Sequence, residues 1–349
     1  MLAQLPFEIV DHILEYIGFN DLRSIARVCS AFRLPTQLRL FRSVYLRPDP
    51  HFTYPNHSYS ILSSPYLLQY ASSLTVSTNG PMQRTYIHSL LSHLPTMSRL
   101  RDMNISLSPH DCSRALSVLE SLGSAREIAL TFRSDLASDM LPSDHPLPVH
   151  SLHMYVDAPT HHVMTRLIQK CSRSLRTLSL FLLDNIIPPL PFLPHLYELS
   201  IRTDLCLISN DPDLVSCFPF LSQHPTITRI SLGSRFTSSV QPPPDLLPNL
   251  QFLDATPAII ERLIPGRPVN HIHTEYPPET SHHFPDDIML QPLRQPFVSV
   301  TTLVIRTRAH LPNEALIKII QALPKLCDFT VYWPCDEVWR FCSKADVQS

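Results

Sequence analysis

The first 41 residues alternate apolar and polar positions at the spacing of α-helices. The stretch LPFEIVDHILEYIGFNDLRSIARVCSAFR, residues 5–33, starts with a proline that suits a first helical turn, and apolar positions then recur every three or four residues. In the first helix these positions are Ile9, Val10, Ile13, Leu14 and Ile17. The pattern predicts helices over 6–17, 21–28 and 30–41, separated by a glycine and by residues that cap helices.

This helical block is small for the number of apolar side chains that it carries. Three helices in about 40 residues enclose little volume, so some of the apolar positions should be buried against another surface. That surface belongs either to a partner protein or, in the alternative interpretation, to a larger domain that the block covers as an N-terminal cap.

From residue 71 onward the chain repeats a short phrase with apolar residues at its first, fourth and sixth positions. The copies start 19 to 31 residues apart, which overlaps the period of about 20 to 29 residues typical of leucine-rich repeats. The clearest copies are LRTLSL (175–180), LYELSI (196–201), ITRISL (227–232), VTTLVI (300–305) and LCDFTV (326–331). Weaker copies lie at 71–76, 100–105, 125–130, 149–154, 250–255 and 269–274.

Helical patterns separate several of these copies, so predicted strands and helices alternate. They lie at 86–94, 113–122, 161–171 and 313–323. A strand–helix unit of this period gives parallel strands joined by short crossovers, and one such unit cannot bury its apolar face alone. The sequence therefore predicts an α/β solenoid with parallel strands on its concave face. A compact α/β domain is the alternative.

The residues of the helical block also resemble a known family. The order LPxEIxxxILxYI, then DLxSIAxVC, FR and LFRSVYL, covers residues 4–46 and is similar to the F-box. The resemblance implies docking onto a Skp-type adaptor, which links the chain to the cullin and RING subunits of a ubiquitin ligase. Carried over by position, the residues that would face the adaptor or support that face are Leu5, Pro6, Ile9, Ile13, Leu14, Val28 and Cys29.

Both parts together resemble fungal-type F-box proteins with irregular leucine-rich repeats. The expected fold class is α+β, an N-terminal three-helix F-box followed by an α/β leucine-rich-repeat solenoid. We expect an F-box over residues 1–46, a linker with an entry helix over 47–70, and the repeat domain over 71–349.

Composition narrows the classes of function. The chain has 28 Lys and Arg against 30 Asp and Glu, and this balance predicts neither a nucleic-acid partner nor a membrane surface. Its five glycines are too widely spaced for the dinucleotide, P-loop or nucleophile-elbow motifs. Its eight cysteines form no CxxC pair, and no signal peptide or apolar run of about 20 residues is evident. We therefore expect a soluble cytoplasmic and/or nuclear protein without a cofactor.

The predicted concave face supplies the candidate substrate-binding residues. Side chains between the apolar positions of each copy should line that face, because strand residues alternate sides. Aromatic, arginine and acidic residues recur there, as they do at protein-binding hot spots. The candidates are His153, Tyr155, Phe181, Arg202, Arg229, Asp254, His273, Glu275, Arg306 and Tyr332. For any single candidate the alternative is a side chain that is merely solvated.

One predicted strand raises the question of a metal. In HIHTEY, residues 271–276, the side chains of His271, His273 and Glu275 would point the same way, and His282 and His283 follow soon after. Alternating ligands of this kind suit zinc, but three on one strand seldom close a tetrahedral site. The sequence therefore predicts a polar patch and no metal.

These expectations combine into one hypothesis of function. The chain would be a non-catalytic substrate receptor of an SCF-type cullin-RING ubiquitin ligase, with the F-box on the adaptor and an unknown target protein on the repeats. Transfer would then be accelerated by effective concentration. One alternative is a leucine-rich-repeat interaction scaffold with no link to a ubiquitin ligase, and another is an enzyme whose site has no recognisable motif.

Overall fold

The computed structural model divides the 349-residue chain into two compact units, residues 1–152 and 153–349. The residues that it describes are 5–28, 30–46, 65–77, 90–107, 118, 127–132, 146–156, 161–183, 186–203, 213–233, 236–237, 240–275, 300–307, 313–332 and 338–341. The division between the units falls within one strand, β5 (Ser151–Val156).

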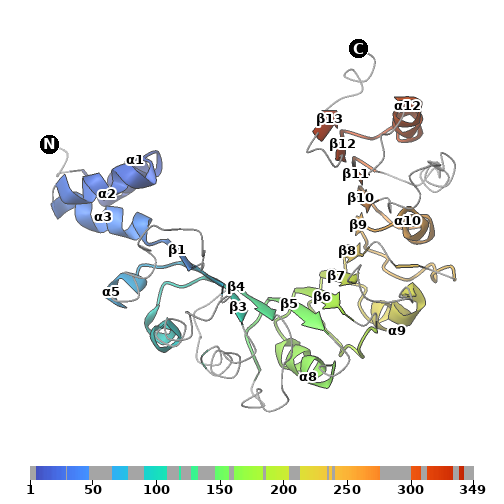
Figure 1. Ribbon diagram of the computed structural model, residues 1–349, viewed down its shortest axis with the longest axis horizontal. Helices are drawn as coiled ribbons and strands as arrows, with labels where there is room; N and C mark the ends of the chain where they lie inside the picture. The colour runs from blue at the N-terminus through green and yellow to red at the C-terminus, as the bar shows by residue number, and fades with distance from the viewer. Residues whose placement is uncertain are drawn as a thin grey trace. The chain divides into compact units, whose positions relative to one another are not determined.

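The first unit begins with three helices, drawn in blue in Figure 1. They are α1 (Phe7–Glu15), α2 (Phe19–Val28) and α3 (Ser30–Leu40). Val10, Leu14 and Leu22 form a buried apolar cluster between them, with four partly buried side chains packed against it: Ile17, Ile25, Phe32 and Leu40. The helical spacing of the apolar residues thus produces a small core, as the sequence predicts.

Parallel strands follow the helices in the first unit. They are β1 (Ser43–Leu46), β2 (Ser73–Ser77), β3 (Asp102–Leu107) and β4 (Glu127–Phe132), paired in chain order. Two short helices lie between them, α5 (Pro65–Leu68) and η3 (Leu94–Thr96). The sheet starts earlier than residue 71, where the sequence places its first strand, because β1 pairs with β2 directly after α3.

The second unit repeats strand and helix through to the end of the described chain. Its strands after β5 are β6 (Thr177–Leu182), β7 (Glu198–Thr203), β8 (Arg229–Leu232), β9 (Phe252–Asp254), β10 (His271–Glu275), β11 (Thr302–Arg306), β12 (Asp328–Tyr332) and β13 (Val338–Phe341). Its helices are α8 (His161–Cys171), η7 (Leu214–Cys217), α9 (Phe218–Ser222), α10 (Pro257–Leu263) and α12 (Asn313–Ala322). Strands β6 to β12 are parallel and follow chain order, whereas β13 pairs antiparallel with β12.

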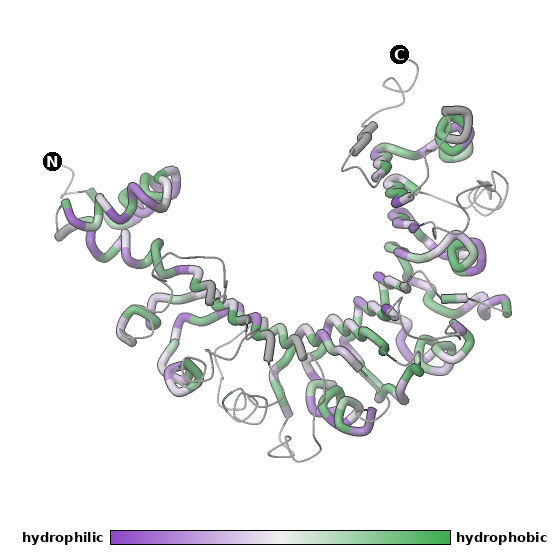
Figure 2. The backbone as a smooth tube through the Cα atoms, viewed as in Figure 1, coloured by the Kyte–Doolittle hydropathy of each residue, from purple (hydrophilic) through white to green (hydrophobic). Residues whose placement is uncertain are grey.

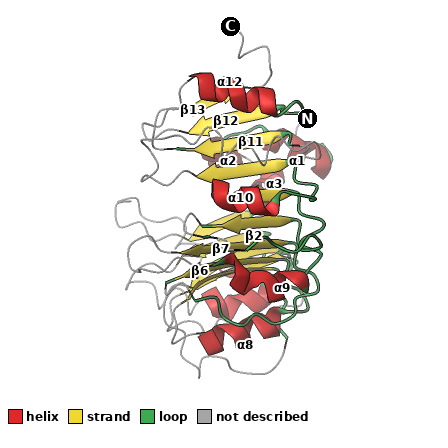
Figure 3. Ribbon diagram, turned by 90° about the vertical axis from the view of Figure 1, so that its right-hand side faces the viewer, coloured by secondary structure: helices red, strands yellow, loops and turns green. Residues whose placement is uncertain are grey.

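Alternation along the strands of the second unit separates the two faces of its sheet. In β6, Leu178, Leu180 and Leu182 are fully buried, and the residues between them are partly exposed. Figure 2 shows the corresponding change between hydrophobic and hydrophilic colours along the tube. Helices α8, α9, α10 and α12 cover one side of these strands, and Figure 3 shows them in front of the sheet.

This topology confirms the predicted fold class, three N-terminal helices followed by leucine-rich-repeat-like strands with helices on one face. The residues at the fourth and sixth positions of each phrase, most of them leucine or isoleucine, are buried because they point toward the helices. The opposite side of the sheet in the second unit is called the strand face below.

Candidate functional site

The first candidate site is an exposed apolar surface on the N-terminal helices. Ile9, Ile13 and Tyr16 follow one another at four and three residues, so they lie on one side of α1 and its C-cap. They are 49%, 43% and 79% exposed, whereas Leu14, next to Ile13, is 1% exposed. Helix α1 therefore carries two apolar stripes, one buried in the core and one in solvent.

This exposed surface extends beyond α1. Of the fourteen large hydrophobic side chains that are exposed in the described part of the chain, seven lie within residues 5–34. They are Leu5, Phe7, Ile9, Ile13, Tyr16, Val28 and Leu34. Exposed apolar side chains that gather in this way mark surfaces that bind another protein. We call the part of this set that excludes Phe7 and Leu34 the docking face.

The predicted adaptor-binding residues take different positions in the structure. Leu5, Pro6, Ile9, Ile13 and Val28 are exposed, and Pro6 is also the N-cap of α1. Leu14 is buried in the helical core, where it supports the face from behind. The prediction for Cys29 lies outside the described residues. Tyr16 was not among the predicted residues, although its spacing of seven residues from Ile9 places it on the same stripe.

An ion pair fixes the orientation of α1 against α3. Arg39 Nε lies 2.7 Å from Asp11 Oδ1, and Arg39 Nη1 lies 4.0 Å from Glu15 Oε1. The Arg39 side chain is mostly buried, so the pair is partly shielded from water and salt. Because Asp11 and Glu15 lie on another side of α1 than Ile13, the ion pair leaves the docking face open.

The second candidate site is the strand face of the second unit. All ten predicted substrate-binding residues are described, and each alternates with buried neighbours on its strand. The parallel register aligns them in rows across the strands. One row runs from Ser200 through Ser231 and Asp254 to His273, and a row beside it carries Glu198, Arg229, Phe252 and His271.

Arg229 is the centre of the best-connected group on this face. Its guanidinium carbon lies 4.5 Å above the centre of the Phe252 ring, and its Nε lies 3.9 Å from Glu198 Oε1. The His273 ring packs against the same Phe252 ring in a T-shaped arrangement, at 4.7 Å between centroids. Stacking and charge together hold the arginine over the sheet in one orientation. Phe252 was not among the predicted candidates, although it precedes Asp254 by two residues and so shares its face.

Asp254 joins this group to its neighbours. Its Oδ2 accepts a hydrogen bond of 3.0 Å from the Ser231 hydroxyl and lies 3.8 Å from Arg202 Nη2. Burial lowers the pKa of His273, while Asp254 raises it and Arg306, His271 and Arg229 lower it further. Burial also lowers the pKa of His153, against an opposing effect of Glu198. Both imidazoles are therefore neutral near pH 7 and able to donate and accept hydrogen bonds.

The remaining candidates lie at two other places on the strand face. The rings of Tyr155 and Phe181 pack at 4.9 Å between centroids on neighbouring strands. Glu275, Arg306 and Tyr332 occupy one row across β10, β11 and β12. The strand face therefore offers aromatic, cationic and anionic groups in fixed positions, a combination suited to a polypeptide ligand.

The structure also bears on the question of a metal. Within the described ranges no three His, Cys, Asp or Glu side chains are arranged to hold a metal ion. His271 Nδ1 lies 2.7 Å from Asn270 Oδ1, its own sequence neighbour. His282 and His283 lie outside the described residues.

Comparison with known protein families supports the family resemblance predicted for the three N-terminal helices. Residues 2–47 match the model of the F-box-like family, which confirms the predicted F-box at this end of the chain. No curated protein sequence matches the chain. No helix in the part of the chain that the structure describes has the length and apolar character needed to cross a membrane.

Two solved structures resemble the chain at low sequence identity. The leucine-rich repeat-containing protein LegL7 from Legionella pneumophila is 13% identical with a TM-score of 0.45, over 85% of this chain and 92% of that one. An internalin from Listeria monocytogenes is also 13% identical with a TM-score of 0.31, over 76% of this chain and 91% of that one. The strand order, the pairing and the burial pattern described above define the repeat fold of this chain.

Proposed function

We propose that this protein is a substrate receptor of an SCF-type cullin-RING ubiquitin ligase. Its docking face binds a Skp-type adaptor, which brings the cullin and RING subunits, and its strand face binds a target protein. The chain itself performs no chemistry in this proposal. It holds the target near the activated ubiquitin and so raises the effective concentration of the acceptor.

One observation carries the first half of the proposal. The segment that matches the F-box-like family also exposes an apolar stripe, Ile9, Ile13 and Tyr16, beside a core that is already complete. Burying apolar surface is favourable by about 25 cal/mol per Å². A protein partner that covers this stripe therefore gains free energy without any change in the helical core.

The second half rests on the chemistry of the strand face. Arg229 contacts Phe252 and Glu198, and Arg202 lies near Asp254, so both side chains are partly oriented before a ligand arrives. Preorganised arginine and aromatic side chains lose little conformational entropy on binding. A protein segment with both charged and aromatic groups is the ligand that this surface fits best. We expect the protein to meet this ligand in the cytoplasm or the nucleus.

The docking proposal is tested by co-purification with a purified Skp-type adaptor. We expect Ile9→Asp/Ile13→Asp to abolish adaptor binding, because it places two carboxylates in an apolar interface. Both side chains are about half exposed in the free chain, so the fold should survive. Ile317→Asp is the matched control, since Ile317 on α12 is equally exposed at 43% and lies in the other unit.

Binding of the adaptor by the wild type and the control, with loss in the double variant, would support the proposal. If the wild type does not bind the adaptor, the helical block is an N-terminal cap and the alternative of an interaction scaffold without a ligase link becomes the better one. If the double variant binds as well as the wild type, the exposed stripe is not the docking face.

A further inference from the structure

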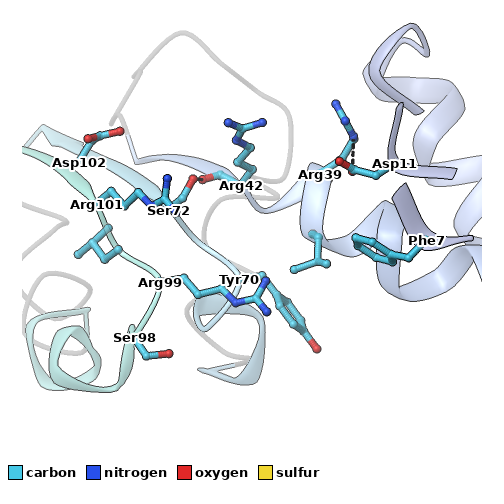
Figure 4. A pocket seen from close by; sticks show the side chains of 12 residues that line it. Phe7, Asp11, Arg39, Arg42, Tyr70, Ser72, Ser98, Arg99, Arg101 and Asp102 are labelled. Carbon is cyan, nitrogen blue, oxygen red and sulfur yellow. Dashed lines mark hydrogen bonds and ion pairs between the residues drawn. The ribbon is translucent and has the colours of Figure 1, made fainter. Parts of the chain in front are cut away.

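A basic cavity lies beside the helical block in the first unit. Its volume is about 690 Å³, within the range of about 300 to 1,000 Å³ that holds compounds of drug size. Helices α1 and α3 form one wall, and the residues just before β2 and β3 form the other, as Figure 4 shows. The charged residues that line it are Arg39, Arg42, Arg99, Arg101, Asp11 and Asp102.

The backbone holds two of these arginines at a fixed separation. Ser72 N donates to Arg42 O at 2.9 Å, and Arg101 N donates to Ser72 O at 2.8 Å. The three residues therefore lie side by side at the starts of β1, β2 and β3, with the Cα atoms of Arg42 and Arg101 about 10 Å apart. At this spacing the long side chains of Arg42 and Arg101 can both reach one anion between them.

Three of the four arginines have no acidic partner in the described part of the chain. Arg39 is engaged with Asp11 at 2.7 Å, but Arg42, Arg99 and Arg101 are exposed and form no ion pair within the described ranges. Asp102 is the acidic side chain left to oppose them. Ser98, Tyr70 and Ser72 add hydroxyl groups to the lining, and Figure 4 shows Arg99 extending toward Tyr70.

The docking face and this cavity occupy different sides of α1. Phe7 and Asp11, four residues apart, line the cavity, whereas Ile9 and Ile13 lie on the opposite side of the helix. An adaptor on the docking face would therefore leave the cavity open. The occupant has to be recognised by arginine and hydroxyl groups, and a guanidinium matches a phosphate group through two parallel hydrogen bonds.

We propose that this cavity binds a small compound that carries several phosphate groups. Arg42, Arg99 and Arg101 give the lining of one cavity an excess of positive charge, and a multiply charged anion is attracted by that charge. The volume accommodates a compound of that size without any rearrangement of the helices. The proposal does not depend on adaptor binding, because it concerns another side of α1.

Isothermal titration of the full chain with inorganic tripolyphosphate, at physiological salt, tests the proposal. We expect Arg42→Ala/Arg101→Ala to weaken binding about 100-fold, roughly tenfold for each charged hydrogen-bond donor removed. The matched control is Arg173→Ala/Arg176→Ala, which removes two exposed arginines, one of them just before β6 as Arg101 is before β3. Tripolyphosphate should also raise the unfolding temperature of the wild type and the control, but not that of the variant.

Several outcomes would overturn the proposal. They are no binding by the wild type, equal affinity in all three proteins, and equal affinity for citrate, which would make the site one for any polyanion. Binding of a phosphoserine peptide but not of tripolyphosphate would assign the cavity to a protein ligand instead. If the double variant does not fold by circular dichroism, Arg99→Gln replaces it, with an expected loss of about tenfold.

Discussion

At the scale of single residues, two buried polar side chains fix the loops of the second unit. Arg267 is buried and donates hydrogen bonds to the carbonyl oxygens of Leu246, Leu263, Pro265 and Pro243, at 2.6 to 2.9 Å. His224 is 1% exposed, accepts from Leu193 N at 2.7 Å through Nε2, and donates from Nδ1 to Phe220 O at 2.6 Å. Both side chains form hydrogen bonds with backbone groups that lie outside the strands and so are not paired within the sheet. Neither was a candidate in the sequence, because a single His or Arg carries no pattern that reveals its partners.

His224 makes the stability of the second unit depend on pH. Burial lowers its pKa below the ordinary value of about 6.5, although the Phe220 carbonyl acts in the opposite direction. The unfolded chain therefore binds a proton at this site before the folded chain does. The stabilisation is complete above about pH 6.5 and is lost progressively as the pH falls from there toward the lower pKa of the folded state.

We predict that His224→Gln reduces this dependence. Glutamine does not titrate and can still accept from Leu193 N, so the variant should lose about 1 kcal/mol at pH 7.5 but lose less further stability on acidification. Urea unfolding of both proteins at pH 7.5 and pH 5.5 measures the difference. His195→Gln, which replaces an exposed histidine of the same unit, is the control. An unchanged pH dependence in His224→Gln would mean that His224 does not carry the effect.

At the scale of elements, the sequence predicted the three N-terminal helices, α8, α12 and most strands, but not α9, α10 or which apolar residues are buried in α1. The helix predicted over 113–122 lies outside the described residues except at Val118. Ile13 and Leu14 are neighbours in the same helical pattern, yet one is 43% exposed and the other 1%. Periodicity identifies an apolar helix, and only the packing of α2 and α3 decides which stripe forms the core. Strand β1 was missed because LFRSVYL, residues 40–46, was assigned to the F-box, although FRSVYL has apolar residues at the first, fourth and sixth positions of the repeat phrase.

Strand β13 was missed for a different reason. It pairs antiparallel with β12, so it follows no repeat of the parallel pattern. The strand face was easier to predict, because the inward leucines of each phrase fix which residues point the other way. The contacts between side chains on the strand face could not be predicted, because the approach of Arg202 to Asp254 depends on the register between three strands.

The two stripes of α1 give a prediction that separates stability from binding. Leu14→Ala should lower the free energy of unfolding by about 2 to 5 kcal/mol because it opens a cavity in the helical core. Ile13→Ala should change it by no more than about 0.5 kcal/mol, but should weaken adaptor binding at least tenfold if the residue is central to the interface. Chemical denaturation and titration with the adaptor provide the two readouts. A large loss of stability in Ile13→Ala would place that side chain in the core and count against the docking face.

At the scale of the whole molecule, the two candidate sites belong to different compact units. The docking face lies within residues 5–28 of the first unit, and every candidate on the strand face lies in the second. Each unit has buried leucines of its own. In the proposed receptor, the adaptor and the target would therefore be bound by residues of different units.

The division predicts that damage to the second unit leaves docking intact. Leu180 in β6 is fully buried beneath the strand face, so Leu180→Ala should lower the free energy of unfolding by about 3 kcal/mol. Its effect on the adaptor dissociation constant should stay within about twofold, because distant sites without shared partners act additively. Leu14→Ala, whose cavity lies beneath the docking face, is the contrasting variant and should weaken docking. An adaptor affinity that falls tenfold in Leu180→Ala would instead show that the repeats transmit their state to the helical block. Target and adaptor would then be expected to change each other's affinity, both by one common factor.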